Sequence, residues 1–82
     1  MHCVYVLKSD SVKTYVGRTS NIKRRIAEHR QQKVWTTKRM GIVELVYFEA
    51  FKVNSDAIRR ERYLKTNKGK KGLKLILRDT FK

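Results

Sequence analysis

The sequence predicts an α+β fold with its elements in the order β-β-α-β-α-α. Two short segments rich in β-forming residues come first, a helical period begins at Asn21, and a third β-rich segment over residues 42–51 precedes further helical patterns. The chain has 82 residues, 40% of them hydrophobic and none of them proline, which predicts one domain over residues 1–82 with one modest core.

The first two strands are predicted over residues 2–7 and 14–18, where valine and tyrosine recur. The segment between them, residues 8–13, is polar and includes Ser9, Asp10 and Ser11, which suits a hairpin turn. We therefore expect Tyr5 and Tyr15 at neighbouring positions of one sheet.

Glycine and small polar residues mark the passage from the second strand to the first helix. Gly17 can adopt a positive φ or let a ligand approach the backbone closely. Thr19, Ser20 and Asn21 offer side-chain oxygens to the exposed amides of a following helix. The segment therefore predicts a strand-turn-helix unit.

The first helix has an apolar stripe with two polar residues at its edge. Ile22, Ile26 and His29 recur at spacings of four and three, with Arg25 between them. Arg25 and His29 are therefore expected on one side of the helix, next to the core. Three other cations of this helix should point elsewhere: Lys23, Arg24 and Arg30.

The middle of the chain combines a basic segment with a hydrophobic one. Residues 31–41 lack an apolar period and predict a basic loop with Trp35 as its one anchor. Residues 42–51 predict a central strand buried on both faces. Glu44 and Glu49 fall on opposite parities of that strand, which predicts a bulge or an early strand end.

The last third of the chain predicts two helices. Ser55 and Asp56 suit the start of the first one. Its apolar stripe consists of Ala57, Ile58 and Leu64. Glu61 falls in the middle of this stripe instead of on the solvent side. Residues 68–72 predict a basic turn, followed by a short amphipathic helix with Leu73, Ile76 and Leu77.

Charge is the strongest signal in the composition. The chain has 21 Lys and Arg against seven acidic residues, a formal charge of +14. Such an imbalance favours a polyanionic partner, nucleic acid first and an acidic membrane surface second, with a merely soluble basic protein as the plain alternative. The most apolar stretch, residues 45–48, is too short to cross a membrane and no signal peptide is apparent, so we expect a cytoplasmic protein.

Any metal site should use oxygen ligands. Cys3 has no partner for an intrachain disulfide, and Cys3 with His2 and His29 makes no zinc ligand set. Glu61 is the candidate ligand, because a carboxylate on an apolar face requires a partner or a metal, and Mg²⁺ (or Mn²⁺) is often held by one or two carboxylates with water and phosphate. The alternative is an ion pair with one of its neighbours: Arg59, Arg60, Arg62 or Lys65.

Four further residues predict chemistry on a phosphodiester. Arg25 can grip a phosphate in two places, and His29 can exchange a proton near neutral pH. The hydroxyls of Tyr5 and Tyr15 can position or help deprotonate water if they meet at one spot. The alternatives are a solvated helix face for Arg25 and ordinary core packing for the tyrosines. Together with a metal on Glu61, these groups supply what phosphodiester hydrolysis requires.

The same residues resemble a known family, the GIY-YIG nuclease superfamily, and in particular its small single-domain bacterial members. The resemblance extends over nearly the whole chain and rests on Cys3-Val4-Tyr5, Tyr15-Val16-Gly17, Arg25, His29 and Glu61. It implies a small three-stranded antiparallel sheet flanked by helices, and a Mg²⁺-dependent site with a single metal.

The resemblance also implies roles for single residues. Glu61 would bind the metal, and Arg25 would stabilise the phosphate. Tyr5 and Tyr15 would lie in the catalytic pocket, one of them helping to activate water, and His29 would assist. Gly17 would keep the strand end open to substrate.

Two departures from the family pattern concern the first motif and an asparagine. Cys3 stands where the family name has glycine, and residues 72–74 lack the asparagine that many members have after the metal-binding glutamate; Asn67 comes too early to match it. Larger relatives add a separate target-recognition domain for which this chain has no room. We therefore expect low intrinsic sequence specificity.

The leading prediction is a Mg²⁺-dependent endonuclease that acts on DNA more readily than on RNA. The alternative is a module that binds RNA or DNA and cleaves it poorly or not at all. A role at a membrane surface has less support, because no basic helix shows a large exposed hydrophobic face. The candidate nucleic-acid contacts are Gly17, Arg18, Lys23, Arg24, Lys38, Arg39, Lys68, Lys70 and Lys71.

Overall fold

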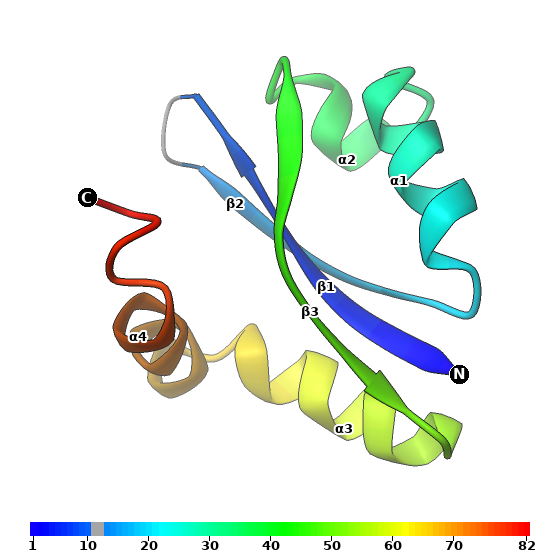
Figure 1. Ribbon diagram of the computed structural model, residues 1–82, viewed down its shortest axis with the longest axis vertical. Coiled ribbons are helices and arrows are strands. Elements are labelled where there is room, and N and C mark those ends of the chain that lie inside the picture. Colours follow the sequence, from blue (N-terminus) through cyan, green and yellow to red (C-terminus); the bar gives the residue numbers. More distant parts are fainter. Residues whose placement is uncertain (11–12) are drawn as a thin grey trace.

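The computed structural model describes residues 1–10 and 13–82, with the backbone alone at residues 35 and 36. Its elements follow the predicted order β-β-α-β-α-α, with one additional short helix (Figure 1). They are β1 (His2–Ser9), β2 (Thr14–Thr19), α1 (Ile22–Arg30), α2 (Trp35–Lys38), β3 (Val43–Phe51), α3 (Asn54–Leu64) and α4 (Asn67–Ile76). The α+β fold class is confirmed, and the segment predicted as a basic loop contains the one-turn helix α2.

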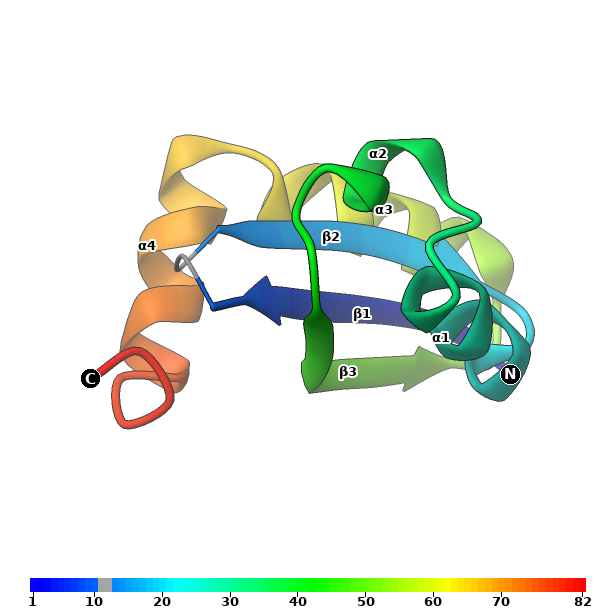
Figure 2. The ribbon, with the colours of Figure 1, turned by 90° about the horizontal axis from the view of Figure 1, so that it is seen from above.

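The three strands form one antiparallel sheet in the order β2-β1-β3 (Figure 2). The prediction of a central strand over residues 42–51 is wrong: β3 is an edge strand, and its Phe48 is 51% exposed. β1 is central instead, and every side chain from Cys3 to Leu7 is buried. Hydrophobic composition indicated burial in both segments, but the place of a strand in the sheet depends on its pairing, and only β1 pairs on both sides.

The predicted irregularity in β3 is present. Val6 pairs with Tyr47 whereas Leu7 pairs with Leu45, so Val46 has no partner in β1 and forms a bulge. Because of the bulge, Glu44 pairs with Lys8 and Glu49 with Val4, so both glutamates lie on the same face of the sheet, whereas a regular alternation would place them on opposite faces.

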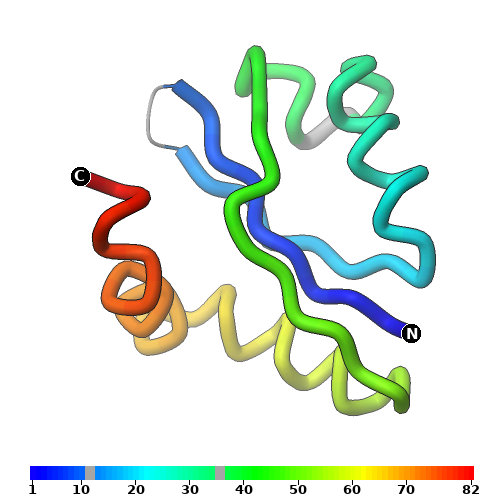
Figure 3. The backbone as a smooth tube through the Cα atoms, in the orientation of Figure 1, coloured from blue at the N-terminus to red at the C-terminus, as the bar shows by residue number. Residues whose placement is uncertain are grey.

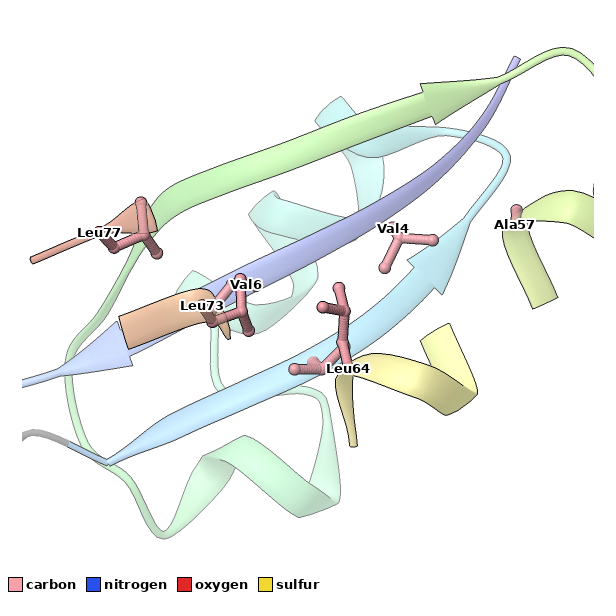
Figure 4. Close-up of a cluster of buried hydrophobic side chains, with 7 residues drawn as sticks. Val4, Val6, Ala57, Leu64, Leu73 and Leu77 are labelled. Atoms are coloured by element: carbon pink, nitrogen blue, oxygen red, sulfur yellow. The ribbon is translucent and has the colours of Figure 1, made fainter. Parts of the chain in front are cut away.

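The helices cover both faces of the sheet. In Figure 1, α1 and α2 lie on one side of the strands and α3 and α4 on the other. Val4 and Val6 of β1 face α3 and α4, where they pack with Ala57, Leu64, Leu73 and Leu77 (Figure 4). Tyr5 and Leu7, which alternate with them, pack with Ile26 of α1 on the opposite face.

The predicted basic turn over residues 68–72 is wrong, because these residues lie within α4. The side chain of Thr66 caps this helix by accepting a hydrogen bond from the Gly69 amide at 3.1 Å. Gly69 is buried, and a Cβ there would lie 2.0 Å from the carbonyl oxygen of Tyr63 in α3. This glycine therefore permits close packing of α4 against the end of α3 and does not form a turn.

The starts of α1 and α3 agree with the predictions to within one residue. Asn21 caps α1 by accepting from the Arg24 amide at 3.1 Å, as its side chain predicts. α3 begins at Asn54, next to the predicted Ser55. The hairpin is confirmed by the pairing of β1 with β2, although Ser11 of the predicted turn lies outside the described residues. The side chain of Trp35, predicted to anchor the loop, also lies outside them.

The two termini lie at opposite ends of the molecule, as the chain trace shows (Figure 3). Among residues 1–10 and 13–82, no helix is long and apolar enough to cross a membrane.

Candidate active site

The candidate site begins with a tyrosine that lies over a glycine. Tyr5 of β1 pairs with Gly17 of β2, and a Cβ on Gly17 would lie 2.5 Å from both Cζ and Oη of Tyr5 and 2.8 Å from the Tyr15 ring. Among the described residues, the glycine with a positive φ is Gly41 and not Gly17. The space that Gly17 leaves is thus filled by the two tyrosines, which fixes where the Tyr5 phenol can lie.

Three rings meet on this face of the sheet. Tyr5 and Tyr15 lie 6.2 Å apart between ring centroids, which confirms their predicted proximity. His29 of α1 lies 5.6 Å from Tyr5 and 5.2 Å from Tyr15. His29 reaches the two tyrosines because its position at the edge of the apolar stripe of α1 directs the imidazole toward the sheet.

A chain of hydrogen bonds connects these rings to the short helix α2. Tyr5 Oη lies 2.8 Å from His29 Nε2, and His29 Nδ1 lies 2.6 Å from Thr37 Oγ1. The Thr37 hydroxyl donates to the Val34 carbonyl at 3.4 Å, and Arg25 Nε donates to Tyr5 Oη at 3.4 Å. One proton arrangement satisfies all four contacts: His29 is neutral, donates from Nδ1 to Thr37, and accepts the Tyr5 proton at Nε2.

The electrostatic environment agrees with that arrangement. Burial raises the pKa of the Tyr5 phenol to about 12, although the hydrogen bond from Arg25 opposes this shift. Burial, and then the positive charge of Arg25, lower the pKa of His29 below its usual value of 6.5. Near neutral pH, Tyr5 therefore keeps its proton, and His29 is an uncharged imidazole able to accept one.

Arg25 connects this buried cluster to the surface. Its Nη1 forms an ion pair with Glu28 at 3.2 Å, and its side chain is 36% exposed. The hydrogen bond to Tyr5 raises the pKa of Arg25 further, so its charge is permanent. A phosphate at the surface can thus contact the same guanidinium that contacts Tyr5.

Glu61 reaches the site from the other face of the sheet. Its Oε1 accepts from Arg18 Nε at 3.3 Å and its Oε2 accepts from Lys65 Nζ at 3.1 Å. The Lys65 pair is one of the partners that the sequence suggested; the Arg18 pair is not. The side chain of Glu61 is 19% exposed.

Glu61 and the tyrosine cluster meet at the same stretch of β2 without a direct bond. Tyr5 lies over Gly17 on one face, and Glu61 is bonded to Arg18, the next residue, on the other. The negative charge of Glu61 is among the smaller causes that raise the pKa of Tyr5. Within the described part of the chain, no hydrogen bond joins Glu61 to Tyr5, Tyr15, Arg25 or His29.

The donor set around Glu61 suits a hard cation held by few protein ligands. Among the described residues, no group of three or more His, Cys, Asp or Glu side chains could hold a metal ion. A single, partly exposed carboxylate fits Mg²⁺ or Mn²⁺, which keep several waters and take further oxygens from a substrate phosphate.

The predicted nucleic-acid contacts are distributed over both sides of the sheet. Gly17 and Arg18 belong to β2, Lys23 and Arg24 to α1, Lys38 to α2, Arg39 follows α2, and Lys68, Lys70 and Lys71 belong to α4. The cations of α1 and the α2 region lie on the side of the Tyr5 cluster, whereas α4 lies on the opposite side (Figure 1). The three lysines of α4 are therefore not part of the cluster around Tyr5.

Similarity to known proteins identifies the family of this chain. The GIY-YIG catalytic domain matches residues 1–74, which include every residue of the cluster and Glu61. The chain belongs to the GIY-YIG family. This is a nuclease superfamily, so nucleic acid is the class of substrate that membership implies.

Relatives within this family match over nearly their whole length. A UPF0213 protein of Staphylococcus haemolyticus is 41% identical over 92% of this chain and 93% of its own. A UPF0213 protein of Clostridium perfringens is 36% identical over 100% of this chain and 89% of its own. The solution NMR structure of the UPF0213 protein BH0048 from Bacillus halodurans superimposes with a TM-score of 0.58 at 31% identity, covering 92% of this chain and 83% of that one.

Thr37 and Asn54 contact residues of the site and were absent from the sequence predictions. Thr37 fixes the proton position on His29, and Asn54 accepts from Arg18 Nη1 at 3.0 Å. Thr37 lay in a segment without periodicity, and Asn54 preceded the predicted helix start. Neither carried a sequence signal, because Thr37 contacts His29 and Asn54 contacts Arg18 across different elements of the fold.

Proposed function

We propose that the protein is a Mg²⁺-dependent (or Mn²⁺-dependent) endonuclease that hydrolyses phosphodiester bonds in DNA with low sequence specificity. The observation that carries this proposal is the hydrogen-bonded series from Arg25 through Tyr5 and His29 to Thr37. The series combines a permanent cation, a hydroxyl and a neutral base. Arg25 is partly exposed to solvent, and the residues that follow it are buried.

The series supplies a route for the proton of an attacking water. Tyr5 Oη donates to His29 Nε2, so it can accept a proton from water while it passes its own proton to the imidazole. Thr37 holds His29 in the tautomer with an accepting Nε2. A free tyrosinate is not needed, which matters because burial holds the pKa of Tyr5 at about 12.

Arg25 and the metal would stabilise the negative charge that develops on the phosphate. Arg25 lies at the mouth of the cluster and can donate to a non-bridging oxygen. Glu61 would hold the metal, which when bound would neutralise the non-bridging and leaving oxygens of the phosphate. The exposed cations of α1 would bind the neighbouring backbone phosphates.

Plasmid nicking tests the proposal. Supercoiled plasmid with Mg²⁺ should become nicked, and nicking should disappear in chelator and in Glu61→Gln. The matched control is Glu44→Gln, which makes the same charge change on an exposed residue of β3 and should nick normally. Binding by Glu61→Gln should persist and weaken steeply with salt. Normal nicking by Glu61→Gln would refute the metal role of this residue.

A second candidate function is a nucleic-acid-binding module with little or no cleavage. The observation in its favour is that both oxygens of Glu61 already pair with cations. In that case a panel of duplex, single-stranded, flapped and branched DNA and RNA should show salt-dependent binding but no divalent-dependent cleavage of any substrate.

A further inference from the structure

Ion pairs occupy both carboxylate oxygens of Glu61, the group that would bind the proposed metal. Arg18 from β2 contacts Oε1 at 3.3 Å, and Lys65, the residue that follows α3, contacts Oε2 at 3.1 Å. A divalent cation approaching either oxygen would meet a positive charge already in place. Coulomb repulsion between these like charges opposes metal binding to the protein alone.

The Arg18 contact has the geometry of an exchangeable partner. Arg60 shows the opposite case in the same molecule: its Nε and Nη2 contact both oxygens of Glu49 at 2.8 and 3.0 Å. Arg18 divides its guanidinium instead, with Nε on Glu61 at 3.3 Å and Nη1 on Asn54 at 3.0 Å. A paired fork of two short bonds holds an arginine more firmly than two single bonds to different groups.

The position of Arg18 places it within reach of a substrate. It directly follows Gly17, over which the Tyr5 phenol lies, and its side chain is 35% exposed. Arginine binds phosphate through two parallel N–H donors, a better match than its divided contact with Glu61 and Asn54. Lys65 is a weaker candidate for this role, because it is an i,i+4 partner at the end of the helix of Glu61 and does not come from the strand of the tyrosine cluster.

We propose that Arg18 is a substrate-operated gate on Glu61. A phosphate of the bound nucleic acid draws the Arg18 guanidinium from Oε1, and this oxygen then becomes available to a divalent cation. Nucleic acid therefore binds first and the metal second, and the free protein binds divalent metal weakly. This inference rests on the proposed role of Glu61 as metal ligand.

Mn²⁺ binding to the full chain, followed by the EPR signal of free Mn²⁺ at low ionic strength, tests the gate. Arg18→Gln removes the repelling charge and keeps an amide that can contact Asn54, so it should bind Mn²⁺ about tenfold or more tightly than the unmodified protein. Arg59→Gln is the matched control: it also removes one charge from a single ion pair, with Asp56, and should bind as the unmodified protein does. Equal or weaker binding by Arg18→Gln would overturn the gate, since Arg18 would then orient Glu61 for the metal.

A double variant separates this inference from the proposed function. If the gain in Arg18→Gln disappears when Glu61→Gln is added, the metal is on Glu61 and the gate stands. If the gain remains, the metal binds elsewhere, and both the gate and the metal role of Glu61 fail. If the unmodified protein binds Mn²⁺ as tightly as Arg18→Gln, the gate alone fails.

The order of binding has its own measurement without metal. In chelator, a phosphorothioate oligonucleotide added to ¹⁵N-labelled protein should shift the Arg18 Nε–H resonance as its bond to Glu61 breaks. The Arg60 Nε–H resonance should not shift, because Arg60 keeps both of its hydrogen bonds to Glu49. An unchanged Arg18 resonance in the bound complex would overturn the proposal.

Discussion

The two faces of strand β1 differ in chemistry although their side chains alternate along one strand. On one face, Val4 and Val6 belong to a hydrophobic cluster that includes Ala57, Leu64 and Leu73 of α3 and α4. On the other, Tyr5 begins a line of hydrogen bonds that continues through His29 to Thr37, and all three residues are at most 1% exposed. Equal burial thus serves stability on one face and proposed chemistry on the other, so substitutions on the two faces should have separable effects.

The largest expected effect is on the chemical face. Tyr5→Phe keeps the ring over Gly17 but removes the hydroxyl that relays the proton, so nicking should fall by roughly 10²–10⁴-fold. The free energy of unfolding should fall only by about 1–3 kcal/mol, because His29 Nε2 loses its donor. Nicking rates and urea unfolding measure the two quantities. Tyr63→Phe, on a tyrosine that is 39% exposed, should change neither appreciably.

The opposite face should show the reverse pattern. Leu64 is 1% exposed in the cluster with Val4 and Val6, so Leu64→Ala should lower the free energy of unfolding by about 2–5 kcal/mol through the cavity it leaves. Nicking per folded molecule should remain normal. Leu75→Ala, on a leucine that is 68% exposed, is the control and should be nearly neutral. A loss of nicking per folded molecule comparable to that of Tyr5→Phe would show that the two faces are coupled.

Two glycines of α4 sharpen the same contrast within one helix. A Cβ on Gly69 would lie 2.0 Å from a backbone oxygen, and rotation of a side chain cannot relieve such a clash. Gly69→Ala should therefore cost about 1–3 kcal/mol of unfolding free energy by displacing α4 from α3. Gly72 has no atom within 4 Å of the corresponding position, so Gly72→Ala should add about 0.5–1 kcal/mol. Thermal unfolding of both variants measures the difference; equal effects would contradict the packing role of Gly69.

The sequence allowed the order of elements to be predicted because strand composition, helical period and the Asn21 cap are local properties. It pointed to the wrong strand as central, since β1 and β3 are both hydrophobic and only their pairing shows which one lies in the middle of the sheet. It placed a turn at Gly69 because glycine is typical of turns, whereas the reason for this glycine is the Tyr63 carbonyl of the neighbouring helix.

The same limit applies to the candidate site. Helical spacing was sufficient to place His29 and Arg25 on the core side of their helix and to single out Glu61 in an apolar stripe, and the family pattern grouped all three with Tyr5. The Arg18 partner of Glu61 is 43 residues away in the chain, and Thr37 contacts His29 from a separate helix. Contacts of this kind depend on how the elements pack, and no period or motif in the sequence specifies them.

The smallest expected effect is a pH dependence that only the chemical face should produce. Burial and the charge of Arg25 lower the pKa of His29 in the folded chain, whereas the unfolded chain takes up its proton near 6.5. The unfolded state therefore binds more protons just below that pH. The stabilising contribution of His29 is complete above 6.5 and is lost as the pH falls through the lower folded value.

Urea unfolding between pH 7 and pH 5 should show this decline in the free energy of unfolding. The His29→Gln variant should be less stable at every pH, and its free energy of unfolding should change less with pH. Glu49 does not interfere, because its bonds to Arg60 lower its pKa below 4.5, so its stabilising contribution is lost only at more acid pH. An unchanged slope in His29→Gln would show that the line of hydrogen bonds does not depend on a neutral imidazole.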